Sequence, residues 1–162
     1  MTTIPRDSSR QPVPSAGLGA WRAFLEAHAR VSEVLARELR ETEGLPLTWY
    51  DVLVQLSEAE EHELRMQELA DAVLLSKSGL TRLVDRMEEA GLVHRRRCPD
   101  DRRGTLARMT DAGYARLRQT APTHLQGVRE HFVDVLTDEE ADVLHRALNR
   151  IAERARGVEP SA

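Results

Sequence analysis

One stretch of the chain carries hydroxyl and cationic side chains in a pattern suited to binding a polyanion. Apolar residues recur at helical spacing after Ser76 and predict a helix, capped by that serine, that runs to about Ala90. Its inward face is predicted to consist of Leu80, Leu83, Val84 and Met87. Hydroxyl and cationic groups at a helix N-terminus suit phosphates and base edges, although they also suit an ordinary solvated face. The polar face and cap of this helix comprise Ser76, Lys77, Ser78, Thr81 and Arg82.

A second group of cations follows in a predicted β-hairpin. Residues 92–97 read as a strand, 98–104 as a turn and 105–109 as a returning strand. The turn carries Arg102 and Arg103, and the negative potential of a narrow minor groove attracts arginine. A hairpin that follows a helix-turn-helix indicates a winged helix.

The charge distribution agrees with a DNA contact in this region. The 162 residues carry a net charge of −4, which by itself argues against a nucleic-acid ligand. Between positions 76 and 108, however, there are nine cationic and five anionic side chains, a local excess of about +4. A basic patch on an acidic body binds a polyanion in one orientation.

The remaining elements are predicted to be helices that position these groups. A helix over about 66–72 precedes the Ser76 helix and makes the helix-turn-helix, and an acidic connector over 58–63 leads into it. Another helix covers about 48–57, where Thr48 and Asp51 are spaced as in a capping box.

Long amphipathic helices lie at both ends of the chain and predict a homodimer. One covers about 18–42; a second starts at 110, is broken or softened at Pro122 and reaches about 136; a third opens at a Thr137 capping box. We therefore expect a mainly α fold with a small β-hairpin wing, a homodimer through its N- and C-terminal helices. The predicted divisions are a disordered arm (1–16), a dimerisation helix (17–43), the winged helix-turn-helix (44–113), the C-terminal dimerisation helices (114–156) and a flexible tail (157–162).

Composition narrows the function classes. The single cysteine, Cys98, cannot form an internal disulfide or a cysteine-based zinc finger, and we expect neither a metal nor another cofactor. No Gly-rich phosphate loop or nucleophile elbow is present, so we expect no enzyme activity. No apolar run of 18 residues is present, so we expect a cytoplasmic protein with no membrane partner.

In combination, these motifs resemble the MarR family of winged-helix transcriptional regulators, in order from position 18 to about 155. The matching stretches are LTWYDVL (47–53), MQELA (66–70), LTRLVDRME (80–88), GLV (91–93), PDDRRG (99–104) and LARMTDAG (106–113). The resemblance implies a homodimer that binds a palindromic operator on double-stranded DNA, most often as a repressor, and that a small organic ligand releases.

The resemblance also implies roles for individual residues. Lys77, Ser78, Thr81 and Arg82 would face the major groove, and Arg102 or Arg103 the minor groove. Asp101 resembles a brace that pairs with an arginine to hold the wing. Phosphate contacts or ion pairs are implied for Arg86, Arg95 and Arg97.

Three readings of the signal remain open. The first is an organic anion or phenolic ligand in a pocket. Trp21, Asp51, Arg82 and Arg95 lie at positions similar to those of the pocket residues in urate-responsive members, and His28 lies on the same helix as Trp21. Oxidation of Cys98, which cations flank, is an alternative. A metal is the third, with Glu61, His62 and Glu63 as the nearest cluster. Beyond regulators, a helical protein-interaction module without a DNA target is the competing function.

Overall fold

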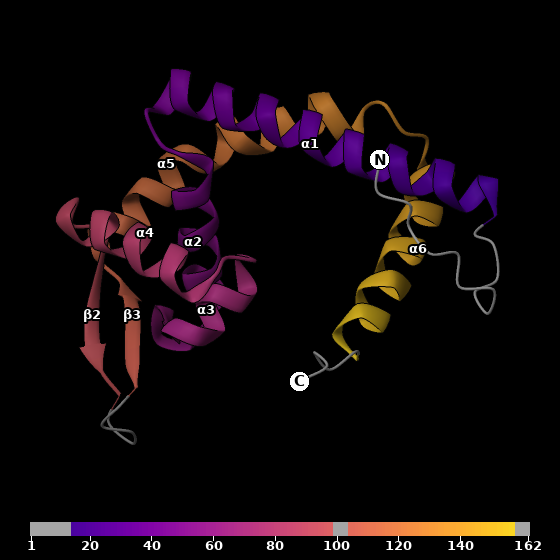
Figure 1. Ribbon diagram of the computed structural model, residues 1–162. Helices are drawn as coiled ribbons and strands as arrows, with labels where there is room; N and C mark the ends of the chain where they lie inside the picture. Colours follow the sequence, from indigo (N-terminus) through magenta and orange to yellow (C-terminus); the bar gives the residue numbers. More distant parts are fainter. Residues whose placement is uncertain (1–13, 99–103, 158–162) are drawn as a thin grey trace, which may run out of the picture.

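The computed structural model describes residues 14–98 and 104–157, and it is mainly helical with a small sheet (Figure 1). None of the helices in these ranges is long and apolar enough to cross a membrane. The helices are α1 (Ser15–Glu43), α2 (Leu47–Glu58), α3 (Met66–Ala72), α4 (Lys77–Glu89), α5 (Asp111–Val128) and α6 (Asp138–Arg156), with a 3₁₀ turn η1 (Glu60–His62) and a π turn η2 (Arg129–Val133).

The predicted hairpin is present, but it belongs to a three-stranded antiparallel sheet. Strands β2 (Val93–Arg97) and β3 (Thr105–Met109) pair with Val93 opposite Met109. A third strand, β1 (Glu63–Arg65), pairs with the other edge of β3. The sequence reading assigned its first residue to the acidic connector and so missed this strand, because three residues are too few to show an alternating pattern.

The hydrophobic core lies where α2, α3 and α4 pack against the sheet, and we call these elements together the winged unit. The four residues predicted for the inward face of α4 are all buried. They meet Leu53 and Leu56 of α2 and Leu69 of α3, none of which retains any exposed surface. This packing fixes which face of α4 points outward.

Two of the predicted helix caps are present and one is wrong. The Ser76 Oγ accepts a hydrogen bond from the Gly79 N–H at 3.1 Å, and Thr137 makes its capping box with Glu140. The Thr48–Asp51 box does not form, because α2 begins one residue earlier, at Leu47, with Pro46 as its N-cap. The Pro46 carbonyl accepts from the Trp49 N–H, so Thr48 already lies inside the first turn.

Helix α1 runs alongside α5, and the two are tied together near the winged unit (Figure 1). Glu43 accepts a hydrogen bond from Thr123 at 2.6 Å and pairs with Arg116 at 3.8 Å. The predicted interruption at Pro122 is wrong: α5 continues through it to Val128. The irregularity lies further along, in the π turn η2.

Helix α6 and much of α1, which we call the terminal helices, expose apolar side chains. No residue of α6 is buried, and the ribbon of α6 stands apart from the winged unit (Figure 1). The exposed large apolar residues here are Leu18, Trp21, Phe24 and Leu25 of α1 and Val143 and Ile151 of α6.

Candidate DNA-binding surface

The outward face of α4 presents the polar residues that the sequence predicted for it. Lys77, Ser78, Thr81 and Arg82 are exposed, as is the cap Ser76. Two hydroxyls also make local bonds: that of Ser76 caps the helix, and the Thr81 Oγ1 donates to the Lys77 carbonyl at 2.9 Å. The helix N-terminus therefore offers hydroxyl oxygens and cations side by side, on a rigid element.

The cations of this region fall into two groups. In the first, the side chain makes no ion pair with any residue in the described ranges, and the residue is exposed. An unpaired surface cation can neutralise a phosphate without first breaking an internal contact. The members of this group are Lys77, Arg82, Arg86 and Arg97.

Arg95 belongs to the second group, because α4 holds its guanidinium. The Arg95 Nη2 lies 2.7 Å from the Asp85 carboxylate and donates to the Thr81 carbonyl at 3.0 Å. Its Nη1 lies 2.8 Å from Glu88, which also accepts from the Arg95 backbone N–H. Of the two roles implied for Arg95, the structure shows the ion pair, and this pair fixes β2 against α4.

Arg96 is paired as well, on the other side of the sheet. It makes a bidentate contact with Glu63 of β1, at 2.8 and 2.5 Å, and Arg108 of β3 lies 4.0 Å from the same carboxylate. The hydrogen bond from Arg96 holds the pKa of Glu63 below its usual value. Sequence reasoning assigned no role to Glu88 or Arg96 and considered Glu63 only as part of a metal cluster, since the pairing depends on β1 and on contacts across turns.

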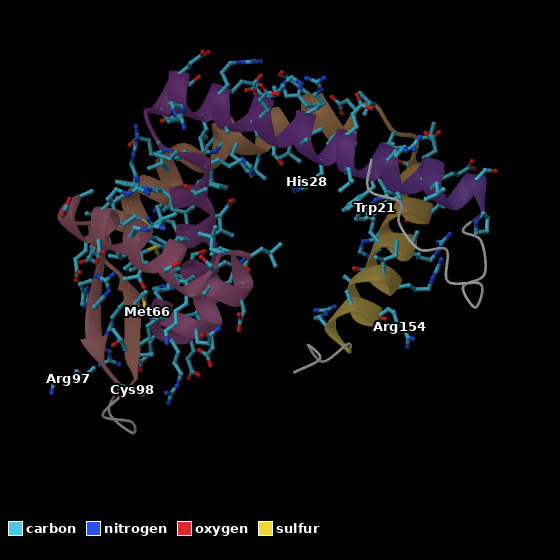
Figure 2. The ribbon with its side chains drawn as sticks, viewed as in Figure 1. Trp21, His28, Met66, Arg97, Cys98 and Arg154 are labelled. Atoms are coloured by element: carbon cyan, nitrogen blue, oxygen red, sulfur yellow. The ribbon has the colours of Figure 1, made fainter. Side chains whose placement is uncertain are left out.

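The structure describes only part of the wing. Figure 2 shows Arg97 at the end of β2, with its side chain directed away from the body of the protein. Asp101, Arg102 and Arg103 lie outside the described residues, so the brace and the minor-groove contact remain predictions.

The residues predicted for the ligand pocket do not come together within one chain. Trp21 and His28 lie on α1, where Figure 2 shows them well apart from the wing, and Arg95 is held by α4. Only Asp51 lines a cavity of about 430 Å³ between α2, the α3–α4 turn and α5, which we call the α2–α5 cavity. Its lining residues are Tyr50, Asp51, Val54, Gln55, Ala72, Val73, Leu74, His124 and Leu125.

The titratable groups of this cavity are perturbed by the surrounding protein. Desolvation raises the pKa of Asp51 above its usual value and lowers that of His124. The same cause, with the nearby charge of Asp51, raises the pKa of Tyr50. The Tyr50 and His124 rings pack with their centroids 4.4 Å apart.

The structure gives less support to the two other readings of the signal, oxidation of Cys98 and a metal bound near His62. Cys98 is buried, with 7% of its surface exposed, at the end of β2, whereas a redox-sensing thiol must be reached by its oxidant. Glu61, His62 and Glu63 fall in η1 and β1. Within the described ranges, no three His, Cys, Asp or Glu side chains are grouped to hold a metal ion.

The fold and its cationic face define a winged helix-turn-helix protein, and comparison with known proteins identifies its family. The MarR family model matches residues 43–104. The chain is 40% identical to AbsC, a MarR family transcriptional regulator from Streptomyces coelicolor, with 92% of this chain and 100% of that one covered and a TM-score of 0.83. The chain therefore belongs to the MarR family.

Two further relatives agree with this assignment. Sco3205, a MarR family regulator from the same organism solved in complex with DNA, is 37% identical, with 94% of each chain covered and a TM-score of 0.82. The transcriptional regulator MhqR of Bacillus subtilis is 32% identical over 91 residues, 56% of this chain and 62% of MhqR. The match thus spans less than two thirds of that curated relative. These relatives are transcriptional regulators rather than enzymes.

Proposed function

We propose that this chain is a sequence-specific DNA-binding transcriptional regulator that acts in the cytoplasm. The observation that carries the proposal is the division of the cations into an unpaired group and a paired group. Those on the outward face of α4 and at the end of β2 have no ion-pair partner among the described residues, whereas Arg95 and Arg96 hold the wing in place. α4 enters the major groove, where Arg82 reads a base and Ser76, Lys77, Ser78 and Thr81 contact bases or phosphates. Arg86 and Arg97 contact the backbone, and the wing tip enters the minor groove.

The protein acts as a homodimer on a palindromic operator. The apolar side chains exposed on α1 and α6 support this proposal, because a soluble protein rarely leaves such an extended apolar face in water. A two-fold dimer places its two α4 helices about 34 Å apart, one turn of DNA, so the operator is an inverted repeat.

Operator binding represses transcription, and a small organic ligand in the α2–α5 cavity releases the DNA. The cavity volume of about 430 Å³ falls within the range of small-molecule sites. The cavity lies where α5 of the dimer-forming part meets α2 of the winged unit. A ligand that prefers a different angle between these helices shifts the spacing of the two α4 helices. A ligand that weakened DNA binding without altering that spacing would contradict this mechanism.

The test is a selection of genomic fragments by the full-length, reduced protein, followed by footprinting. We expect a protected inverted repeat that binds two chains, and a reporter whose promoter carries it should be repressed. Arg82→Ala should cost about 1–3 kcal/mol on the selected site and relax specificity at one base position in each half-site. Arg118→Ala, on the exposed part of α5, is the matched control. If no fragment is enriched, the protein-interaction module replaces this proposal.

A further inference from the structure

The charge of the α2–α5 cavity does not favour an organic anion, one of the three signals that the sequence left open. Among the residues that line it, Asp51 is the one with a formal charge, and there is no lysine or arginine. Val54, Val73 and Leu125 supply apolar walls. An anion that entered would lose hydration and would meet a carboxylate without a compensating cation.

Neither titratable neighbour supplies the missing positive charge. His124 packs on Tyr50, and its Nδ1 is buried without a hydrogen-bond partner among the described residues. A proton there would place an unsatisfied charge in the protein interior, in line with the lowered pKa of this imidazole. His124 is therefore neutral at pH 7 and does not attract an anion.

Asp51 itself lacks a partner. Asp51 is exposed, its carboxylate makes no hydrogen bond or ion pair with the described residues, and partial desolvation by the surrounding atoms raises its pKa. A charged donor from a ligand would provide the bond that the chain does not, and charge-assisted hydrogen bonds are the strong ones. Beside it, the Tyr50 and His124 pair offers aromatic surface to a flat ring.

We propose that the α2–α5 cavity binds an aromatic ligand with a protonated amine or amidine, anchored by Asp51, and rejects organic anions. This inference rests on the proposed ligand-released regulator, since it names the ligand class of the same cavity. It departs from the organic-anion reading, one of the three that the sequence left open.

The test compares three probes that share one ring: benzylamine, benzyl alcohol and benzoate. Each is titrated into the full-length protein without DNA, with NMR shifts of the Tyr50 and His124 rings as the readout. We expect benzylamine to bind with a dissociation constant on the order of 1 mM, as suits a fragment of its size. It should bind roughly tenfold or more tightly than benzoate, from one charge-assisted hydrogen bond.

Two variants test whether Asp51 causes the preference for benzylamine over benzoate. Asp51→Asn should abolish the preference for benzylamine, while Glu58→Gln, an exposed carboxylate on the same helix, should keep it. Asp51→Asn changes an exposed residue that makes no hydrogen bond or ion pair with the described residues, so we expect the variant to fold, which circular dichroism checks. The inference is overturned if benzoate binds as tightly as benzylamine, if Asp51→Asn keeps the preference, or if no probe shifts the two rings. These titrations contain no DNA, so their failure leaves DNA binding standing, and failure of the fragment selection leaves the cavity result standing.

Discussion

The winged unit and the terminal helices bury their apolar residues to very different extents. Leu53, Leu56 and Leu69 of the winged unit are fully enclosed by the chain itself. Trp21 of α1 and Ile151 of α6 remain 55% and 63% exposed. The same amphipathic pattern in the sequence thus produces a closed core in one region and an open face in the other. Under the proposed homodimer, a second copy of the chain covers this open face.

The largest effect is expected in the closed core. Leu56→Ala removes a fully buried side chain between α2 and its neighbours and should lower the free energy of unfolding by about 2–5 kcal/mol. Urea denaturation followed by circular dichroism measures this loss. A loss below about 1 kcal/mol, as is usual for surface sites, would mean that the core relaxes around the cavity and is less tightly packed than described.

The open face should respond in its state of association rather than in its fold. Val143→Asp together with Ile151→Asp places charges on the apolar stripe of α6 and should weaken dimerisation about 100-fold or more. Sedimentation equilibrium measures the change, and the helical circular dichroism of the winged unit should persist. Arg146→Lys, which keeps the charge on the same helix, serves as the control. A double variant that remains dimeric would place the interface elsewhere.

The two groups of cations should differ in how salt affects their contribution to operator binding. Arg97→Ala removes a phosphate contact and should reduce the slope of log affinity against log salt by about 1. Arg95→Ala should weaken binding by releasing β2 from Asp85 and Glu88, with the slope unchanged, and Arg95→Lys should restore only part of the affinity because it loses the fork geometry. Equal changes of slope in both alanine variants would mean that Arg95 itself contacts the DNA.

The smallest effect concerns the Arg96–Glu63 pair and pH. The pKa of Glu63 is lower in the folded chain than its usual value of 4.5, so the pair stabilises the fold above that pH. This stabilisation is lost as the pH falls through the folded pKa of Glu63. Thermal melts between about pH 6 and pH 3 should therefore show a shallower acid decline for Glu63→Gln than for the parent. Parallel curves for the two proteins would mean that the pair does not contribute to the acid stability of the wing.

The sequence was sufficient where periodicity or a strong cap decides the structure. The inward face of α4 and the Ser76 and Thr137 caps follow from spacing alone, and the structure confirms them. The capping box at Thr48 was wrong because a proline two residues earlier starts the helix sooner. Pro122 did not break α5, because packing of α5 against α1 and α2 outweighs the cost of a proline within a helix.

The candidate site was predictable in its outline but not in its internal contacts. The exposed face of α4 follows from its buried face. The pairing of Arg95 with Glu88 does not, because it depends on how β2 returns along α4 after the turn. The family resemblance placed Trp21, His28, Asp51 and Arg95 at one pocket, and the tertiary structure of the chain separates them.

The most direct test of the central claim is a fluorescence-anisotropy titration of the full-length protein against its selected operator across a salt series. We expect specific binding of two chains to one inverted repeat, with a slope of log affinity against log salt of roughly −4 or steeper. If the reduced, ligand-free protein shows no preference for any fragment over random DNA, the outward cations of α4 and β2 do not form a DNA-reading surface, and the regulator proposal is wrong.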